Sequence, residues 1–209
     1  LLEALMEVRH RATKDLDLWM YHVEGGSGAR VIQPPEGEDN DGPPQRYMGA
    51  AFGDDDRWIW LATREGSWRY NTKLPDYQLV VFDRESGDIS ERTFRWGSAF
   101  RPTLSPDGRW LVYGTGHDAQ TGLMLRDLES GDERWLAYPV QRDDQESRAT
   151  RDAYMGMSFT PDSRRLIASY GGRIWSIPID GSAATEIPFQ APVKLALGPK
   201  VQFDYEVHD

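Results

Sequence analysis

The 209-residue chain contains no cysteine. Disulfide bonds and thiolate zinc sites are therefore excluded, although this absence does not assign a cellular compartment. No apolar run is long enough for a membrane-spanning helix, and no segment has a sustained helical period. Strands joined by turns are left as the main structural elements to look for.

Residues typical of active sites are also scarce. The four histidines, His10, His22, His117 and His208, are scattered and form no His-x-His or His-Glu-x-x-His motif that would bind a metal. No Gly-x-Ser-x-Gly motif marks a nucleophilic serine. The acidic segment 36–42 lacks the spacing and the closing glutamate of a calcium-binding loop. We therefore expect no catalytic residue, no metal and no cofactor in this chain.

Basic residues are too few for a nucleic-acid partner. The net charge is −10 at pH 7, whereas binding of phosphates requires clustered lysine and arginine. Much of the acid lies in predicted turns, including segment 36–42 between two Pro-Pro pairs. We expect this segment to be a solvated loop.

What the chain does contain is a repeat. Its clearest copy is Leu-Ser-Pro-Asp-Gly-Arg-Trp-Leu-Val-Tyr at 104–113, which 159–168 matches position by position, and a weaker copy lies at 52–61. Each copy has one aspartate at its turn: Asp55, Asp107 and Asp162. Successive aspartates are separated by 52 and 55 residues. Fixed spacing in this range is typical of solenoids, propellers and arrays.

The turn in the repeat has a physical basis. Pro106 presets φ for the first central position, Asp107 suits the second, and Gly108 can take the left-handed conformation that closes a three-residue hairpin. Ser163 stands at the position of Gly108 in the last copy. We expect Ser163 to adopt the same conformation, at a cost of roughly 1 kcal/mol. The turn aspartates and Gly108 are therefore interpreted as structural.

A second motif follows each of these turns. It is an apolar strand that leads into a turn with aspartate and glycine, at 79–88, 123–136 and 174–181. Each unit then holds four short strands joined by hairpins, which is the composition of one β-propeller blade. The sequence predicts an all-β fold, a partial β-propeller of four-stranded antiparallel blades.

The chain is short for a complete ring. At roughly 40–50 residues per blade it holds about four blades at most, and a closed propeller needs about four to eight. We divide 1–209, treated as one partial propeller, into an incomplete blade, three blades and strands that lead to a further blade or domain: 1–33, 47–94, 98–138, 153–189 and 192–209. An open ring leaves unpaired strand edges, which favour self-association.

Two irregular segments interrupt the repeat and are candidates for an interaction surface. One is the aromatic-rich insertion 65–77, and the other is the charge-rich link 141–152. Insertions in repeat folds map to loops on one face, often the binding face. Alternatively, the aromatic side chains cover a neighbouring blade and the charges of the link pair with each other. The candidate interaction residues are Trp68, Tyr70, Tyr77, Arg142, Arg148 and Arg151.

The Ser-Pro-Asp-Gly-Arg-Trp and Thr-Pro-Asp-Ser-Arg-Arg units, each followed by a strand that ends near Asp-x-x-x-Gly, resemble the blades of TolB-like, WD-repeat-like propellers over nearly the whole chain. Segments 68–71, 142–152 and 169–175 resemble the propeller region that precedes the catalytic barrel in large bacterial amidohydrolases. The metal-binding histidines of that family lie in the barrel, and no position here matches them. The resemblance to TolB-like proteins implies a periplasmic or secreted location.

These resemblances imply a non-catalytic module of a larger metal-dependent amidohydrolase, which limits access to the active site or holds a partner. Two alternatives stay open. One is a freestanding TolB-like protein-binding propeller, and the other is the gating propeller of a prolyl-oligopeptidase-like serine hydrolase. The expected partner is another protein or the missing domain of the same protein, with no nucleic acid and no membrane span.

Overall fold

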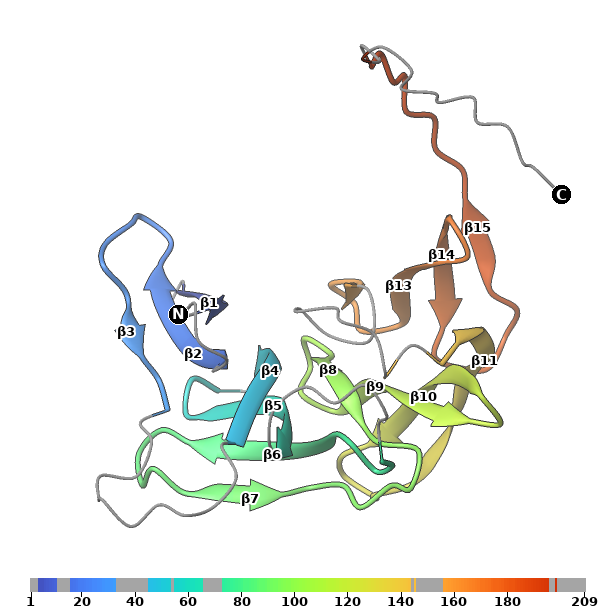
Figure 1. Cartoon of the computed structure of the whole chain (residues 1–209). Helices are drawn as coiled ribbons and strands as arrows, with labels where there is room; N and C mark the ends of the chain where they lie inside the picture. Colours follow the sequence, from blue (N-terminus) through green and yellow to red (C-terminus); the bar gives the residue numbers. More distant parts are fainter. Residues whose placement is uncertain are drawn as a thin grey trace, which may run out of the picture.

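A computed structural model describes residues 4–10, 16–32, 45–53, 55–65, 73–143, 145, 156–195 and 198. Every regular element in these ranges is a β-strand. The strands form four antiparallel sheets that follow one another along an arc (Figure 1). The acidic segment 36–42 lies outside the described residues.

Each sheet is built from strands in chain order. The first consists of β1 (Ala4–His10), β2 (Leu16–His22) and β3 (Ala29–Arg30). The second consists of β4 (Gln45–Phe52), β5 (Trp58–Glu65), β6 (Gln78–Asp83) and β7 (Ile89–Glu91). The third consists of β8 (Phe100–Leu104), β9 (Trp110–His117), β10 (Gln120–Asp127) and β11 (Glu133–Arg142). The fourth consists of β12 (Met157–Phe159), β13 (Arg165–Tyr170), β14 (Arg173–Pro178) and β15 (Thr185–Ile187).

The first strands of the four-stranded sheets are neighbours in space. β4 contacts β8, and β8 contacts β12, so these strands line the inner side of the arc. Successive strands are hairpin partners and step outward from there. This is the arrangement of propeller blades, and it confirms the predicted class of four-stranded antiparallel blades.

Apolar side chains between the sheets make the core. The larger cluster joins the second, third and fourth sheets, and its fully buried members include Phe100, Leu111, Tyr113, Leu123 and Leu166. A smaller cluster joins the first and second sheets: Leu18, Ile32, Ile59, Leu61, Val80 and Phe82. Because side chains of a strand alternate between its two faces, a sheet packed on both faces buries nearly every apolar residue.

The repeat turns are closed by their aspartates. In each turn one carboxylate oxygen accepts the backbone N–H of the residue two positions later, at 2.8 Å for Asp55, 3.2 Å for Asp107 and 3.1 Å for Asp162. Gly108 has a φ of 71° and Ser163 a φ of 59°. The left-handed conformation expected for Ser163 is therefore confirmed.

In the second and third sheets, an ion pair joins the repeat turn to the turn between the last two strands of the same blade. The Arg57 guanidinium donates to Asp83 at 2.8 Å, and the Arg109 guanidinium donates to Asp127 at 2.8 Å. These hydrogen bonds lower the pKa values of both carboxyl groups below their usual range. Each pair therefore joins two turns that lie at the same end of a blade.

The chain after β15 enters the region 192–209, where further strands are expected. The described residues 192–195 have no regular secondary structure. Val193 and Leu195 are exposed. No described strand lies beside this segment to accept its backbone hydrogen bonds, which a strand requires. Residues 199–209 lie outside the described part of the chain.

Candidate interaction surface

Four chain segments meet at one end of the second and third sheets. They are the end of the insertion at Leu74, the β7–β8 connection, the β9–β10 turn and the start of the link at Asp143. Together they line one cavity of about 840 Å³. The two irregular segments singled out in the sequence thus approach each other here. We call this the aromatic cavity, because exposed rings form much of its rim.

Two large side chains stand out from the β7–β8 connection. Phe94 is 80% exposed and Trp96 is 78% exposed. The residue between them, Arg95, points the other way, and its guanidinium donates to Glu133 at 2.8 Å and to Thr115 Oγ1 at 3.3 Å. This alternation of side chains places Phe94 and Trp96 on the solvent side of an extended segment.

The backbone of this segment is fixed. The Arg95 N–H donates to Gln78 Oε1 at 3.0 Å, and the Gln78 side-chain amide donates to the Arg95 carbonyl at 2.7 Å. The following Gly97 carbonyl accepts the Gly116 N–H at 2.8 Å. A Cβ at Gly97 would lie 1.8 Å from the Gly116 carbonyl oxygen, so only glycine permits this approach. The exposed rings are therefore held by an ordered backbone.

A second group of rings lies on the neighbouring hairpin. Trp135 and Tyr138 of β11 have ring centroids 4.7 Å apart, and the His117 ring is 6.1 Å from Trp135 and 5.6 Å from Tyr138. The Tyr138 hydroxyl donates to the His117 carbonyl at 2.9 Å. A Cβ at Gly122 would lie 2.5 Å from the Trp135 ring. The glycine thus makes room for the tilted rings of Trp135 and Tyr138.

The β9–β10 turn at the rim is strained. Asp118 has a φ of 46° and Ala119 a φ of 57°, in a two-residue turn closed by the pair His117 and Gln120. Such turns need positive φ at both central residues and favour glycine or asparagine there. A non-glycine residue in this region costs of order 1–3 kcal/mol. Backbone strain of this kind clusters at functional sites.

The inner part of the cavity is polar. Gln145 is 3% exposed, and its amide nitrogen donates to Asp143 Oδ2 at 2.9 Å and to the Gly97 carbonyl at 3.2 Å. The Gln145 N–H donates to Asp143 Oδ1 at 3.0 Å. The Gln145 Oε1 is enclosed by protein, and the part of the chain that the structure describes offers it no hydrogen-bond donor.

The predicted interaction residues lie in different parts of the molecule. Arg142 is exposed at the end of β11 but does not line the cavity. Tyr77 is 5% exposed, packs edge-on against Phe100 at 6.1 Å and accepts a hydrogen bond from Arg64 at 2.9 Å. Its assignment to an interaction surface is corrected, because its ring belongs to the core. Trp68, Tyr70, Arg148 and Arg151 lie outside the described residues.

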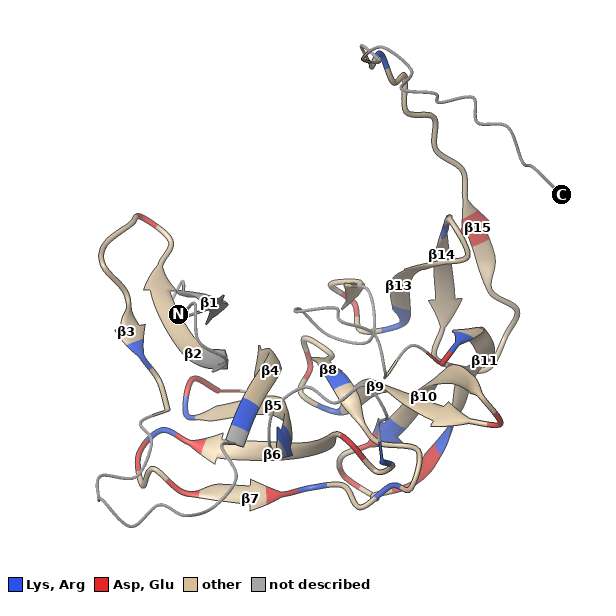
Figure 2. Cartoon of the chain, in the orientation of Figure 1, with Lys and Arg blue, Asp and Glu red and all other residues tan. Residues whose placement is uncertain are grey.

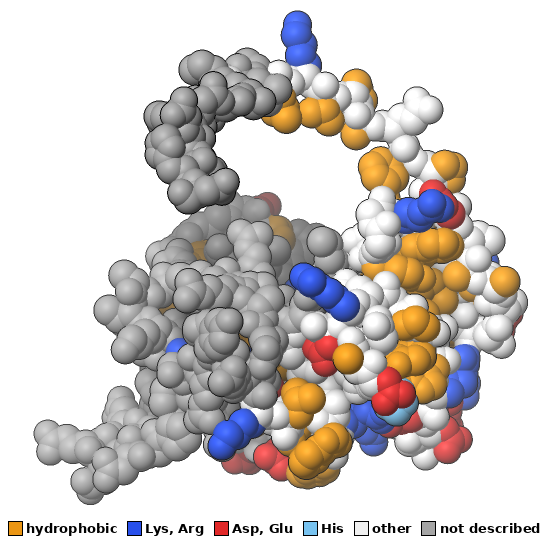
Figure 3. All heavy atoms as spheres, turned by 45° about the vertical axis from the view of Figure 1, so that its right-hand side comes forward, with side chains coloured by type: hydrophobic (Ala, Val, Ile, Leu, Met, Phe, Trp, Pro, Cys, Tyr) orange, Lys and Arg blue, Asp and Glu red, His pale blue; other side chains and the backbone are white. Residues whose placement is uncertain are grey.

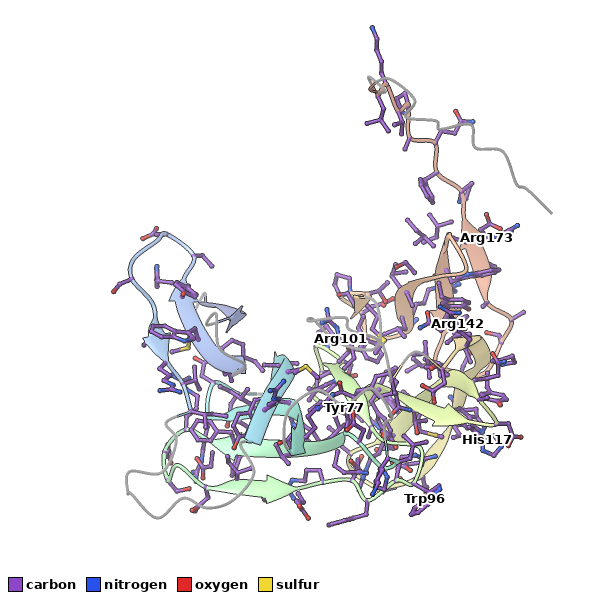
Figure 4. The ribbon with its side chains drawn as sticks, viewed as in Figure 1. Tyr77, Trp96, Arg101, His117, Arg142 and Arg173 are labelled. Atoms are coloured by element: carbon purple, nitrogen blue, oxygen red, sulfur yellow. The ribbon has the colours of Figure 1, made fainter. Side chains whose placement is uncertain are left out.

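The figures show the same contrast between the buried Tyr77 and the residues of the aromatic cavity. Tyr77 lies among other side chains in the middle of the molecule, whereas Trp96 and His117 lie at its margin (Figure 4). Hydrophobic side chains gather beside a histidine and acidic groups on the face turned forward in Figure 3. Lysine and arginine are interspersed with acidic residues over the four sheets (Figure 2).

The sequence analysis overlooked Phe94 and Trp96. Both lie in a connection that follows the short strand β7, outside the two segments that break the repeat. The available signal was the pattern Phe-Arg-Trp, which places two aromatic side chains on one side of an extended segment. Whether that side faces solvent is decided by the neighbouring blade, which the pattern does not specify.

The described residues contain no group of three or more histidine, aspartate or glutamate side chains arranged to hold a metal ion. The same part of the chain has no helix that could cross a membrane.

Comparison with solved structures assigns the fold. TolB from Acinetobacter baumannii superposes with a TM-score of 0.59 over 90% of this chain, at 16% identity. The fold is that of a TolB-like β-propeller. A protein assigned as TolB from Agrobacterium tumefaciens has a TM-score of 0.56 over 88% of the chain, at 15% identity. A puromycin hydrolase has a TM-score of 0.54 over 88% of the chain, at 17% identity.

These similarities are structural. No family model and no curated protein sequence matches the chain. At 15–17% identity, the likeness establishes the fold alone. The TolB-like propeller described here spans 41% and 59% of the two TolB chains and 31% of the puromycin hydrolase. The resemblance to amidohydrolase propellers receives no support from these structures.

Proposed function

We propose that this chain is a non-catalytic propeller module that binds a protein partner at the aromatic cavity. The observation that carries the proposal is the exposure of Phe94 and Trp96 on a backbone fixed by Gln78. Aromatic residues dominate the binding energy of protein interfaces, and a pre-ordered segment loses little entropy on binding. Exposed rings on an ordered backbone therefore favour a binding role over a role in packing.

The role of the module in a larger protein is a separate proposal. The likeness to a puromycin hydrolase, of which this chain spans 31%, favours a propeller that adjoins a hydrolase domain. The amidohydrolase parent rests only on the sequence resemblance at 68–71, 142–152 and 169–175. In either parent the aromatic cavity would contact the adjoining domain or a separate protein.

Selection from a displayed library of random peptides tests the binding role. We expect peptides selected on the purified chain to bind the double variant Phe94→Ala, Trp96→Ala at least about tenfold more weakly than the wild type. The reason is that aromatic anchors contribute about 2 kcal/mol or more. Phe189→Ala is the matched control, because Phe189 is an exposed aromatic residue outside the cavity. Selected peptides that bind the double variant as tightly as the wild type would contradict the proposal.

Self-association through open strand edges stays a prediction. In the described first sheet β1 is an edge strand, because the order is β1-β2-β3. An unpaired edge offers backbone N–H and C=O groups to a second chain. Sedimentation over a hundredfold concentration range should show a rise in molar mass, whereas a constant monomer mass would refute the expectation.

A further inference from the structure

The aromatic cavity is rich in hydrogen-bond acceptors that lack a cationic partner. Asp118 at the rim is 82% exposed, and its one described partner is His117 at 3.5 Å. Asp143 accepts hydrogen bonds only from Gln145 among the described residues. The arginine that lines the cavity, Arg95, is directed to Glu133 instead. Among the residues that the structure describes, two carboxylates therefore border the cavity without a lysine or arginine paired to them.

A neighbouring amide holds one of these acceptors in place. Gln145 lines the cavity, and its amide nitrogen donates to Asp143 Oδ2 at 2.9 Å. In the described part of the chain the charged rim is therefore acidic, and it complements a ligand that carries positive charge and N–H donors.

The aromatic rim adds a preference among donors. Trp96 and Phe94 are largely exposed and line the same cavity as the two carboxylates. A cation over an aromatic face is attracted by the ring quadrupole, most strongly over tryptophan. A guanidinium group combines a planar surface for stacking with five N–H donors in a fixed arrangement, whereas an ammonium group has three donors and no plane.

We infer that the aromatic cavity binds an arginine side chain of a protein partner, with the guanidinium group against Trp96 and its N–H groups directed to the carboxylates of Asp118 and Asp143. This inference rests on the proposed binding role and names the chemistry of the partner. The cavity of about 840 Å³ also has room for apolar residues next to the arginine, which Phe94 and Leu74 would cover. The partner segment is therefore basic and apolar, and complements a chain of net charge −10.

Three pentapeptides test this inference directly. Each has a central residue between two leucines, flanked by glycine and blocked at both ends, and the central residue is arginine, lysine or the neutral isostere citrulline. Binding is followed on the isotope-labelled chain through the indole N–H signal of Trp96, assigned with Trp96→Phe. We expect saturable shifts with the arginine peptide, weaker binding with lysine, and about tenfold weaker binding with citrulline, which lacks the charge.

Variants of the acceptors complete the experiment. Asp143→Asn and Asp118→Asn should each lower the affinity for the arginine peptide several-fold and leave the affinity for the citrulline peptide unchanged. Asp132→Asn, in the β10–β11 turn, should change neither affinity. Thermal unfolding verifies that Asp143→Asn is folded, and the exposed Asp118 gives a second test if it is not. Equal affinity for the arginine and citrulline peptides would overturn the inference.

The outcomes separate the two proposals. Library peptides that depend on Phe94 and Trp96 but show no preference for arginine would leave the binding role in place and remove the arginine ligand. Library peptides that ignore Phe94 and Trp96 would remove both. Arginine binding that shifts no Trp96 signal would place the cation elsewhere and overturn the inference as well.

Discussion

The third and fourth sheets contain the best-matched copies of the repeat, yet they differ in burial. Val112 of β9 is fully buried, whereas Ile167, at the equivalent position of β13, is only half-buried. The third sheet contacts both the second and the fourth through β8, while the fourth sheet contacts the third through β12. Matched strands of the repeat therefore become fully buried only where neighbouring sheets cover both of their faces.

The two sheets also differ in their turns. The β13–β14 turn has Gly171 and Gly172 at φ values of 60° and 72°, while the same two-residue turn in the third sheet has Asp118 and Ala119. The strained version is the one that borders the aromatic cavity. Glycine would meet the fold requirement with less strain, so Asp118 and Ala119 place extra backbone strain at the border of the cavity.

A third difference concerns charge. Arg109 pairs with Asp127 at 2.8 Å in the third sheet. The equivalent positions of the fourth sheet hold Arg164 and Pro178, because Asp127 is paired with Trp110 and Pro178 with Arg165 in the same register. The fourth sheet therefore has no carboxylate at the position of Asp127. The backbone hydrogen bonds that both sheets share are therefore sufficient to form these turns. The ion pair is an additional interaction of the third sheet.

The burial difference predicts the largest effect on stability. Val112→Ala should lower the free energy of unfolding by about 2 kcal/mol, from lost burial plus a cavity. Ile167→Ala removes more atoms from a half-buried site and should cost only about 1 kcal/mol. Urea unfolding of the two variants measures both changes in the free energy of unfolding. A larger cost for Ile167→Ala would mean that the fourth sheet is covered on both faces.

The turn difference predicts changes of opposite sign. Ala119→Gly should raise the free energy of unfolding by about 0.5 kcal/mol, because relief of left-handed strain exceeds the added entropy of the unfolded glycine. Gly172→Ala imposes the strain on the fourth sheet and should lower stability by about 1 kcal/mol. Thermal unfolding of both variants tests the pair. If Ala119→Gly is destabilising, the β9–β10 turn does not have the positive φ described here.

The ion pair predicts a small, pH-dependent effect. The hydrogen bond from Arg109 lowers the pKa of Asp127 in the folded chain, so the stabilisation is present above the unfolded value of about 3.9 and is lost as pH falls through the folded value. Asp127→Asn should therefore differ most from the wild type near neutral pH and converge with it below about pH 4. Because Arg109 is half-exposed, solvent screening keeps the difference small.

Stability measured against pH checks this expectation, with Asp132→Asn, an exposed neighbour, as the control. A difference that grows as the solution is acidified would contradict the assignment of the pair.

Ser163 predicts the smallest net change. Its hydroxyl oxygen accepts the Asp107 backbone N–H of the preceding blade at 3.1 Å. Ser163→Gly relieves left-handed strain but removes this hydrogen bond, and the two terms of roughly 1 kcal/mol each nearly cancel. Ser163→Ala keeps the strain and loses the bond, so it should cost about 1 kcal/mol. Chemical unfolding in which Ser163→Gly stabilises by 1 kcal/mol would show that the bond contributes nothing.

Local sequence patterns were sufficient for the blade and insufficient for the site. The strand–turn–strand units around Asp107 and Asp162 predicted antiparallel hairpins, because turn chemistry and strand alternation act between residues close in sequence. The interruption of this pattern marked the insertion 65–77 as a candidate interaction segment, which wrongly assigned Tyr77 to a binding surface. That ring is buried by Phe100, a residue of the next sheet.

By itself the sequence determined the all-β class, the four-stranded blade and the left-handed turn at Ser163, since these follow from propensities, alternation and turn residues within one repeat. Only the tertiary structure decided which side chains are exposed and which segments meet. Leu74, Trp96, His117 and Asp143 come from four separate connections, yet they border one cavity. Their meeting depends on how one sheet packs against the next, an arrangement between distant residues that no local pattern encodes.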